Sequence, residues 1–169
     1  MENFTKIKLN LACGDLYADG YINIDNKSQY DGTFKVDMEA DILLLDWDEN
    51  SVDEILLSHF LMYIPYDDVP KILTKWYGWL KEGGLLVMEQ GNVKVVAQKI
   101  IESNDPEIIN GKDGVRQLYG FETTVGHKWA WCPETIVPIL KKIGFKDIRI
   151  GDGVIHNNPT RDFVVEAIK

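Results

Sequence analysis

Short apolar runs recur along the chain, and their lengths predict β-strands rather than helices. The first run alternates apolar and polar residues and ends at Gly14, which is typical of a strand followed by a turn. The later runs are more continuously apolar, as in strands that are buried on both faces of a sheet. The predicted strands are residues 7–12, 21–24, 34–36, 54–57, 84–89, 147–150 and 162–168.

Two segments between the later strands have the period of amphipathic helices. The first begins at residues 67–68, two aspartates that can cap a helix, and ends at the glycine pair 83–84. The second begins at Pro133 and ends before Gly144. Pro138 lies inside this second helix and should kink it or delay its start, because proline has no backbone N–H group to donate.

This order of elements predicts an α/β fold with a mostly parallel sheet. A length of 169 residues fits a single domain, residues 1–169. Residues 103–132 break both periodicities and contain several glycines and aromatic residues. Long irregular segments of small domains often bind ligands, so we expect 103–132 to form a lid or an acceptor-binding segment.

The chain is acidic, with 18 lysines and arginines, 27 aspartates and glutamates, and a formal net charge of −9. Such a chain repels phosphate backbones and anionic lipids, so we expect no broad binding to nucleic acid or to membranes. No apolar run approaches the length of about 20 residues that spans a bilayer. No signal peptide precedes the first strand, and we therefore expect a cytoplasmic protein.

The two cysteines, Cys13 and Cys132, lie far apart in the sequence and outside any CxxC pair. This spacing gives no support to a disulfide framework or to a zinc site. We therefore expect two reduced thiols and no bound metal.

Residues that directly follow the first strands are candidate ligand contacts, because ligands of parallel sheets bind beyond the carboxyl ends of the strands. Gly14 follows the first strand and lets a ligand approach the backbone. Asp25 follows the second strand and can accept hydrogen bonds from two vicinal ribose hydroxyls. Asp37 follows the third strand and can accept from an adenine amine, while the sulfur of Met38 can cover the ring.

Each of these residues alone is more often a turn glycine or a solvated loop carboxylate. Together, at three successive strand ends, they favour a nucleoside site. The loop after the first strand is not a GxGxxG motif, because the next glycine after Gly14 is Gly20. A pyrophosphate ligand, and with it a nicotinamide-dependent reductase, is therefore disfavoured.

Five segments resemble, in order along the chain, motifs of the class I S-adenosylmethionine-dependent methyltransferases, and in particular of a short branch of predicted methyltransferases. They are LNLACG at 9–14, GYINID at 20–25, LDWDENSVDEI at 45–55, LKEGG at 80–84 and KIGF at 142–145. Each motif alone is weakly specific, whereas the ordered set covers most of the chain.

The resemblance implies a Rossmann-like sandwich whose seven-stranded sheet has the order 3-2-1-4-5-7-6, with strand seven antiparallel. It also implies S-adenosylmethionine as the cofactor and S-adenosylhomocysteine as its product. The loop after the first strand would hold the methionine moiety, the next two strand ends the ribose and the adenine, and the end of the fourth strand the sulfonium. The implied cofactor contacts are Ala12, Cys13, Gly14, Asp25, Asn26, Asp37, Met38, Ser58 and His59.

The sequence departs from the family pattern at two places. Ala12 stands where the family has the first glycine of its loop, which narrows the approach to the backbone. Met62 and Tyr63 stand where many relatives have a Glu-His pair after the fourth strand. The second departure leaves open a non-catalytic module of the same fold.

Aromatic residues are the candidate acceptor contacts, because their rings can stack on a sugar, a base or another flat molecule. They are Tyr63, Tyr119, Trp129 and Trp131. An ordinary aromatic core under a loop is the alternative for the two tryptophans. His127 is the candidate general base, with a loop histidine bonded to the backbone as its alternative, and His156 has less to recommend it.

We therefore expect S-adenosylmethionine-dependent methyl transfer to a small-molecule or glycan-type acceptor. The alternative is a non-catalytic module, or a partner subunit of the same fold, that binds S-adenosylmethionine or S-adenosylhomocysteine. Methyl transfer does not strictly require a base, because the sulfonium is already activated and alignment supplies much of the acceleration. The sequence leaves open whether the chain associates with itself or with a partner protein.

Overall fold

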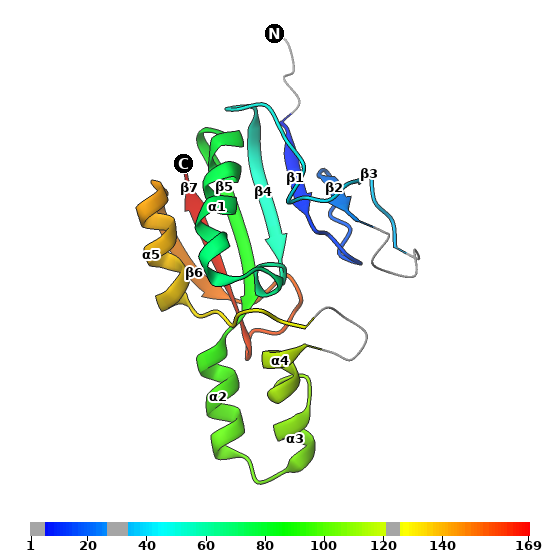
Figure 1. Cartoon of the computed structure of the whole chain (residues 1–169), viewed down its shortest axis with the longest axis vertical. Coiled ribbons are helices and arrows are strands. Elements are labelled where there is room, and N and C mark those ends of the chain that lie inside the picture. Colours follow the sequence, from blue (N-terminus) through cyan, green and yellow to red (C-terminus); the bar gives the residue numbers. More distant parts are fainter. Residues whose placement is uncertain (1–5, 27–33, 121–125) are drawn as a thin grey trace.

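The sheet has the strand order β3-β2-β1-β4-β5-β7-β6 in the computed structural model, which describes residues 6–26, 34–120 and 126–169 (Figure 1). The strands are β1 (Lys8–Leu11), β2 (Ile22–Asp25), β3 (Met38–Glu39), β4 (Val52–Ser58), β5 (Leu80–Gly91), β6 (Lys146–Asp152) and β7 (Asp162–Ile168). Neighbours from β3 to β5 pair in parallel, and β7 pairs antiparallel with both β5 and β6. The predicted strand order and the antiparallel seventh strand are confirmed.

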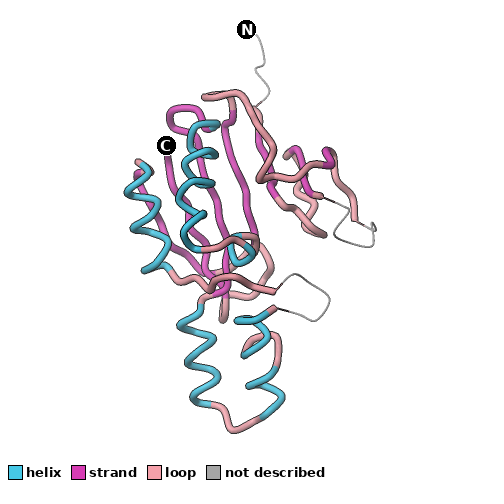
Figure 2. The backbone as a smooth tube through the Cα atoms, viewed as in Figure 1, coloured by secondary structure: helices cyan, strands magenta, loops and turns pink. Residues whose placement is uncertain are grey.

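The helices divide into two groups. α1 and α5 lie side by side on one face of the sheet, whereas α2, α3 and α4 extend beyond the carboxyl end of β5 (Figures 1 and 2). The helices are α1 (Val69–Trp79), α2 (Val93–Glu102), α3 (Pro106–Asn110), α4 (Val115–Tyr119) and α5 (Pro133–Ile143), with 3₁₀ turns at Leu61–Tyr63 and Tyr66–Asp68.

The hydrophobic core lies between the sheet and the pair α1 and α5. Side chains alternate between the two faces of a strand, and this alternation places Leu57 of β4 and Leu86 of β5 toward the helices. Both leucines are fully buried, as are Leu73 of α1 and Leu140 of α5. Burying each such side chain contributes about 1.5–3 kcal/mol. This core therefore holds the carboxyl ends of the central strands in a defined arrangement.

No helix of the described residues covers the opposite face of the sheet (Figure 1). The ammonium of Lys8 on β1 lies 2.6 Å from the carboxylate of Glu54 on β4. The hydroxyl of Tyr21 also hydrogen-bonds to Glu54. Among the described residues, the helices that pack on the sheet therefore lie on one face, and the predicted Rossmann-like α/β fold is confirmed.

The third strand lies later in the chain than predicted. The sequence pattern placed it at 34–36, but pairing with β2 begins at Met38, which lies opposite Ile24. The backbone N–H of Asp37 donates to the carbonyl of Asn23 at 2.8 Å and introduces this pairing. The error moves the end of the third strand by several residues, which changes the residues that reach the ligand site.

The first helix is shorter than predicted, and two parts of the helical structure were missed. α1 ends at Trp79 rather than at 83–84, because Leu80 already pairs with Val52 as the first residue of β5. α2 was not predicted, and α3 and α4 lie inside the segment 103–132 that the pattern left irregular. Pro138 is accommodated within α5, which begins at Pro133 without delay.

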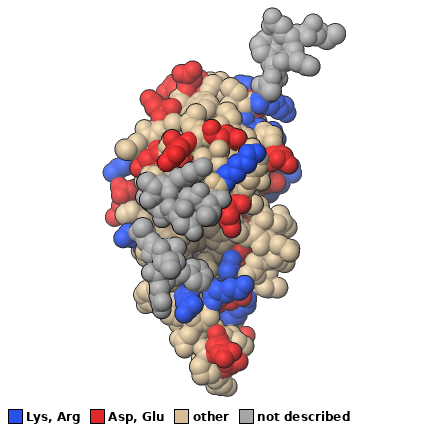
Figure 3. Space-filling model, turned by 90° about the vertical axis from the view of Figure 1, so that its right-hand side faces the viewer, with Lys and Arg blue, Asp and Glu red and all other residues tan. Residues whose placement is uncertain are grey.

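None of the described helices has the length and apolarity that a bilayer crossing requires. Acidic and basic side chains are interspersed on the face of the molecule that Figure 3 shows. This surface differs from the continuous basic stripe that typifies nucleic-acid-binding domains.

Candidate functional site

A cavity of about 450 Å³ lies at the carboxyl ends of β1, β2 and β4. This is the position at which α/β sheets bind their ligands. The lining residues are Ala12, Cys13, Gly14, Asp15, Asp25, Asn26, Ala40, Asp41, Ile42, Leu43, Ser58, His59, Phe60, Tyr63, Ile64 and His156. Eight of the residues predicted from sequence are thus brought together: Ala12, Cys13, Gly14, Asp25, Asn26, Ser58, His59 and Tyr63.

The turn after β1 presents its backbone to the cavity. Ala12 and Gly14 both have left-handed backbone conformations, with φ of 51° and 52°. This conformation costs a non-glycine residue about 1–2 kcal/mol, so Ala12 is a strained substitute for the glycine of the family motif. Burial raises the pKa of the Cys13 thiol to about 11, so the thiol stays protonated at neutral pH.

Asp25 links the turn after β1 to the end of β2. Its Oδ2 accepts from the backbone N–H of Gly14 at 2.7 Å, and its Oδ1 accepts from the N–H of Asn26 at 2.6 Å. The residue is 8% exposed and lines the cavity. A carboxylate offers about four acceptor positions, and the hydrogen bonds found among the described residues occupy one on each oxygen of Asp25.

Asp37 and Met38 do not line the cavity, in contrast to the prediction. The Oδ2 atom of Asp37 accepts from both the backbone N–H and the side-chain amide of Asn23, each at 2.9 Å, and Oδ1 accepts from the Tyr17 hydroxyl. These hydrogen bonds, those from Asn23 first, lower the pKa of the Asp37 carboxyl. Asp37 thus joins β2 to β3, and residues 40–43 form this wall of the cavity.

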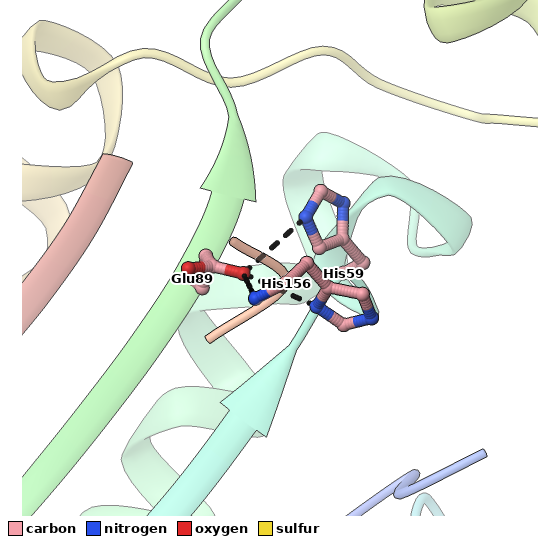
Figure 4. Close-up of side chains that lie close together, drawn as sticks. All are labelled: His59, Glu89 and His156. Atoms are coloured by element: carbon pink, nitrogen blue, oxygen red, sulfur yellow. Dashed lines mark hydrogen bonds and ion pairs between the residues drawn. The ribbon is translucent and has the colours of Figure 1, made fainter. Parts of the chain in front are cut away.

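Two histidines that line the cavity, His59 and His156, meet the buried carboxylate of Glu89 at its floor (Figure 4). The buried carboxylate of Asp162 also lies beside His59. The Nε2 atom of His59 lies 3.0 Å from Oδ2 of Asp162 and 3.7 Å from Oε1 of Glu89. The Nδ1 atom of His156 lies 3.1 Å from the same Glu89 oxygen and 2.8 Å from the Ser58 hydroxyl. His59 has a φ of 50°, and such strain often accompanies functional sites.

The electrostatics of this floor keep both carboxylates ionised. Burial alone would raise the pKa of Glu89, but hydrogen bonds from the ring and backbone of His156 and from the N–H of Ile155 outweigh it and lower the pKa. Burial likewise opposes ionisation of Asp162, yet hydrogen bonds from His59 and Arg161 lower its pKa to about 2. The bond to Glu89 raises the pKa of His156 in turn.

His127, the candidate base, does not line the cavity. Its Nδ1 atom lies 2.9 Å from the backbone carbonyl of Gln117, and its ring contacts Tyr63 edge-on at 5.1 Å. Burial lowers the pKa of the imidazole. This geometry matches the alternative that the sequence left open, in which His127 is a loop histidine bonded to the backbone.

The predicted acceptor aromatics separate into different environments. Tyr63 lines the cavity, whereas Tyr119 is exposed on α4 and lies outside the lining. Trp131 is 1% exposed and belongs to the hydrophobic core. Trp129 is 43% exposed and packs on Tyr66 at 4.9 Å. The alternative of an aromatic core therefore describes Trp131.

Gly153 lies in the turn between β6 and β7, where the backbone packs closely against Asp162. A Cβ atom there would lie 2.4 Å from the Cβ of Asp162 and 2.9 Å from its carbonyl carbon. We expect Gly153→Ala to cost about 1–3 kcal/mol of stability, measured by urea unfolding. Gly151→Ala is the matched control, because its Cβ meets nothing within 4 Å. Equal losses in both variants would contradict this packing.

Comparison with known proteins gives a consistent result. Residues 9–88 match a family model described as a methyltransferase domain, and a search of curated proteins found no match. The fold is similar to that of a SAM-dependent methyltransferase from Archaeoglobus fulgidus, with a TM-score of 0.68 and 17% identity over 98% of this chain and 87% of that one. An S-adenosylmethionine-dependent methyltransferase from Mesorhizobium loti gives a TM-score of 0.61 and 13% identity over 96% and 90% of the two chains.

A larger protein shows the same fold as part of a longer chain. Phosphoethanolamine N-methyltransferase 2 from Haemonchus contortus, in complex with S-adenosyl-L-methionine, gives a TM-score of 0.59 and 12% identity. The match covers 97% of this chain and 48% of that protein, so this chain spans about half of its length. Sequence identities this low establish a similarity of fold alone.

Proposed function

We propose that the chain belongs to the class I S-adenosylmethionine-dependent methyltransferases, because residues 9–88 match a methyltransferase-domain model and the fold is similar to that of such enzymes. We propose further that its cavity binds the cofactor and that the protein transfers the methyl group to a small-molecule acceptor. The arrangement of Asp25 is the observation that carries this proposal. Among the described residues each of its two oxygens accepts a single backbone hydrogen bond, and the residue lines the cavity. Two adjacent acceptors match the two vicinal hydroxyls of a ribose.

The charge of the cavity supports the same cofactor. The described lining residues include three aspartates, Asp15, Asp25 and Asp41, and no lysine or arginine. S-adenosylmethionine brings a cationic sulfonium and an ammonium group, which such a wall attracts. A dinucleotide would instead place its pyrophosphate among carboxylates without a cationic partner, which is unfavourable.

The walls of the cavity suggest how the cofactor lies. The backbone of 12–14 would hold the methionine end, as the sequence predicts. Residues 40–43 would contact the adenine in place of Asp37 and Met38, because they form the wall next to Asp25. The sulfonium would then lie near Ser58 and His59 at the end of β4. Holding the acceptor atom in line with the methyl group and the sulfur supplies much of the acceleration of such a reaction.

A non-catalytic binding module is the second candidate. The positions that follow β4 are occupied by Met62, which is buried, and Tyr63, which lines the cavity. Neither side chain is a carboxylate or an imidazole, the two groups that many relatives have at these positions. A module of this kind would bind both forms of the cofactor and release no product.

Calorimetric titration with S-adenosylhomocysteine tests the proposed cofactor site. We expect one molecule to bind per chain with a Kd in the micromolar range, about −8 kcal/mol, and NAD to produce no heat of binding. Absence of S-adenosylhomocysteine binding at about 1 mM ligand, about −4 kcal/mol, would overturn the proposal. Release of S-adenosylhomocysteine from S-adenosylmethionine in the presence of small hydroxyl and amine acceptors separates the enzyme from the module.

A further inference from the structure

We propose that His59, Glu89 and His156 bind a divalent transition-metal ion of the zinc and cobalt type at the floor of the cavity. The three side chains come from three segments: the residue after β4, the strand β5, and the turn between β6 and β7. Ion binding itself does not depend on the proposed methyl transfer. Only the use that the protein makes of the ion rests on the proposed function.

The distances between the three donor atoms suit a single ion. The Oε1 atom of Glu89 lies 3.1 Å from Nδ1 of His156 and 3.7 Å from Nε2 of His59, and all three donors lie within 4.8 Å of one another. A tetrahedral ion about 2.1 Å from each ligand separates its ligands by about 3.4 Å. Figure 4 shows both rings directed toward the same carboxylate oxygen.

The charge balance at the floor favours a cation. The side chains of Glu89 and Asp162 are both 0% exposed. The guanidinium of Arg161 pairs with Asp162 at 2.6 Å and also lies 3.2 Å from Asp113. The only ion-pair partners found for Glu89 among the described residues are the two imidazoles. A buried carboxylate needs hydrogen bonds or positive charge. Glu89 has the hydrogen bonds from the backbone N–H groups of Ile155 and His156, and a divalent ion on the same three donors would add the positive charge that no lysine or arginine of the described residues gives it.

The two histidines give the site access from the cavity. The side chain of His59 is 17% exposed and that of His156 is 37% exposed, and both line the cavity. His59 has a left-handed backbone conformation, with φ of 50°, and Oδ2 of Asp162 lies 3.0 Å from its Nε2 atom as a further oxygen near the site. Three protein ligands with an open position toward a cavity are typical of catalytic rather than structural zinc sites.

The open position identifies the class of acceptor that such an ion would serve. A hydroxyl group could complete the coordination, because its oxygen keeps a further lone pair after it binds the ion, and a bound metal would lower the pKa of that hydroxyl. The acceptor would lose its proton to solvent on binding. Its lone pair would then form the new bond to the methyl carbon as the carbon–sulfur bond breaks, and neutral S-adenosylhomocysteine would leave. This chemistry needs no base at His127.

Titration of the metal alone tests the site without any knowledge of the acceptor. The full chain, free of any affinity tag and treated with chelator, would be titrated with Zn²⁺ and separately with Co²⁺ at neutral pH. We expect one ion per chain, with a Kd of about 10 μM or tighter, about −7 kcal/mol. The visible spectrum of the Co²⁺ form should show nitrogen and oxygen ligation without a thiolate charge-transfer band.

Matched variants locate the ion. His156→Ala lies on a surface turn and should weaken binding at least tenfold, since it removes one ligand. His127→Ala and Cys13→Ser should leave the affinity for the metal ion unchanged. His127 lies outside the cluster, and Cys13 lies in another part of the cavity wall with its thiol protonated. The Co²⁺ spectrum of the wild-type chain distinguishes nitrogen and oxygen ligands from a thiolate, and this result does not depend on the folding of any variant.

Two outcomes would overturn the site. One is the absence of Zn²⁺ and Co²⁺ binding below about 100 μM, in which case the cluster is a proton-linked hydrogen-bond network. The other is an affinity that His156→Ala preserves or that Cys13→Ser abolishes. Titration with S-adenosylhomocysteine on the same metal-free sample keeps the two proposals apart, because either ligand can bind without the other.

Discussion

Replacing Trp131 by alanine should lower the free energy of unfolding by about 3–5 kcal/mol. The indole is 1% exposed, belongs to the core cluster and stacks on Tyr66 at 5.8 Å. Its removal leaves a cavity that α5 and the carboxyl end of β5 cannot close without moving. Urea unfolding followed by circular dichroism measures the loss, and it avoids a fluorescence signal that the substitution itself changes.

Trp129→Ala is the matched control for this prediction, because Trp129 also packs on Tyr66 yet is 43% exposed. We expect its loss to stay below about 1 kcal/mol, as for most exposed positions. A small loss for Trp131→Ala would contradict the core assignment. It would return Trp131 to the role of an acceptor contact that the sequence had suggested.

Replacing Asp25 by alanine should weaken S-adenosylhomocysteine binding at least a hundredfold, about 2.7 kcal/mol. The variant loses the two hydrogen bonds that the ribose hydroxyls are expected to donate to the Asp25 carboxylate, and a hydrogen bond to a charged group contributes about 1.5–3 kcal/mol. It also releases the N–H of Gly14, which Asp25 holds at 2.7 Å, so the turn after β1 loses its anchor. Calorimetric titration gives the affinity directly.

Asp19→Ala controls for the change in net charge, because Asp19 is an exposed acid in the same loop and lies outside the cavity lining. Its affinity for S-adenosylhomocysteine should equal that of the wild-type chain. A thermal melt of Asp25→Ala confirms that the domain is folded at the temperature of the titration. Wild-type affinity in Asp25→Ala would show that the ribose lies elsewhere.

The sheet could be predicted from the sequence because its evidence is local and repeated. Each strand is a short apolar run, and the ordered motifs that follow those runs resemble one family, which implies the strand order. The helices beyond β5 could not be predicted as readily. α2 has one buried residue, Val96, so its exposed surface gives only a weak apolar stripe.

The wall formed by residues 40–43 shows how a shift in a predicted strand changes which residues are expected to line the cavity. The alternation Phe34-Lys35-Val36 looks like a strand, but the residues that pair with β2 are Met38 and Glu39. The prediction therefore assigned Asp37 and Met38 to the adenine. Counting from the observed strand end assigns 40–43 instead, and those residues line the cavity.

His156 was undervalued because its partner is distant in sequence. Strand β7 runs antiparallel to β5 and pairs Asp162 with Gly91, so the turn before Asp162 must lie at the carboxyl end of β5. The implied strand order contained this information. The pairing of His156 with Glu89 could not be derived from it, because the sequence does not show which face of β5 carries Glu89. The expectation of no metal rested on cysteine spacing and did not consider His and Glu donors from three segments, so it stays a prediction that the proposed titration tests.

The helix-free face of the sheet has a consequence for the thermodynamics of unfolding. The heat-capacity change and the denaturant m-value both scale with the surface that unfolding newly exposes, and apolar surface dominates the former. A sheet with polar residues such as Lys8, Tyr21 and Glu54 on one face hides less apolar surface than a sheet covered on both faces. The stability curve of this domain should therefore be flatter with temperature, and its urea transition broader, than those of a two-sided α/β domain of equal length.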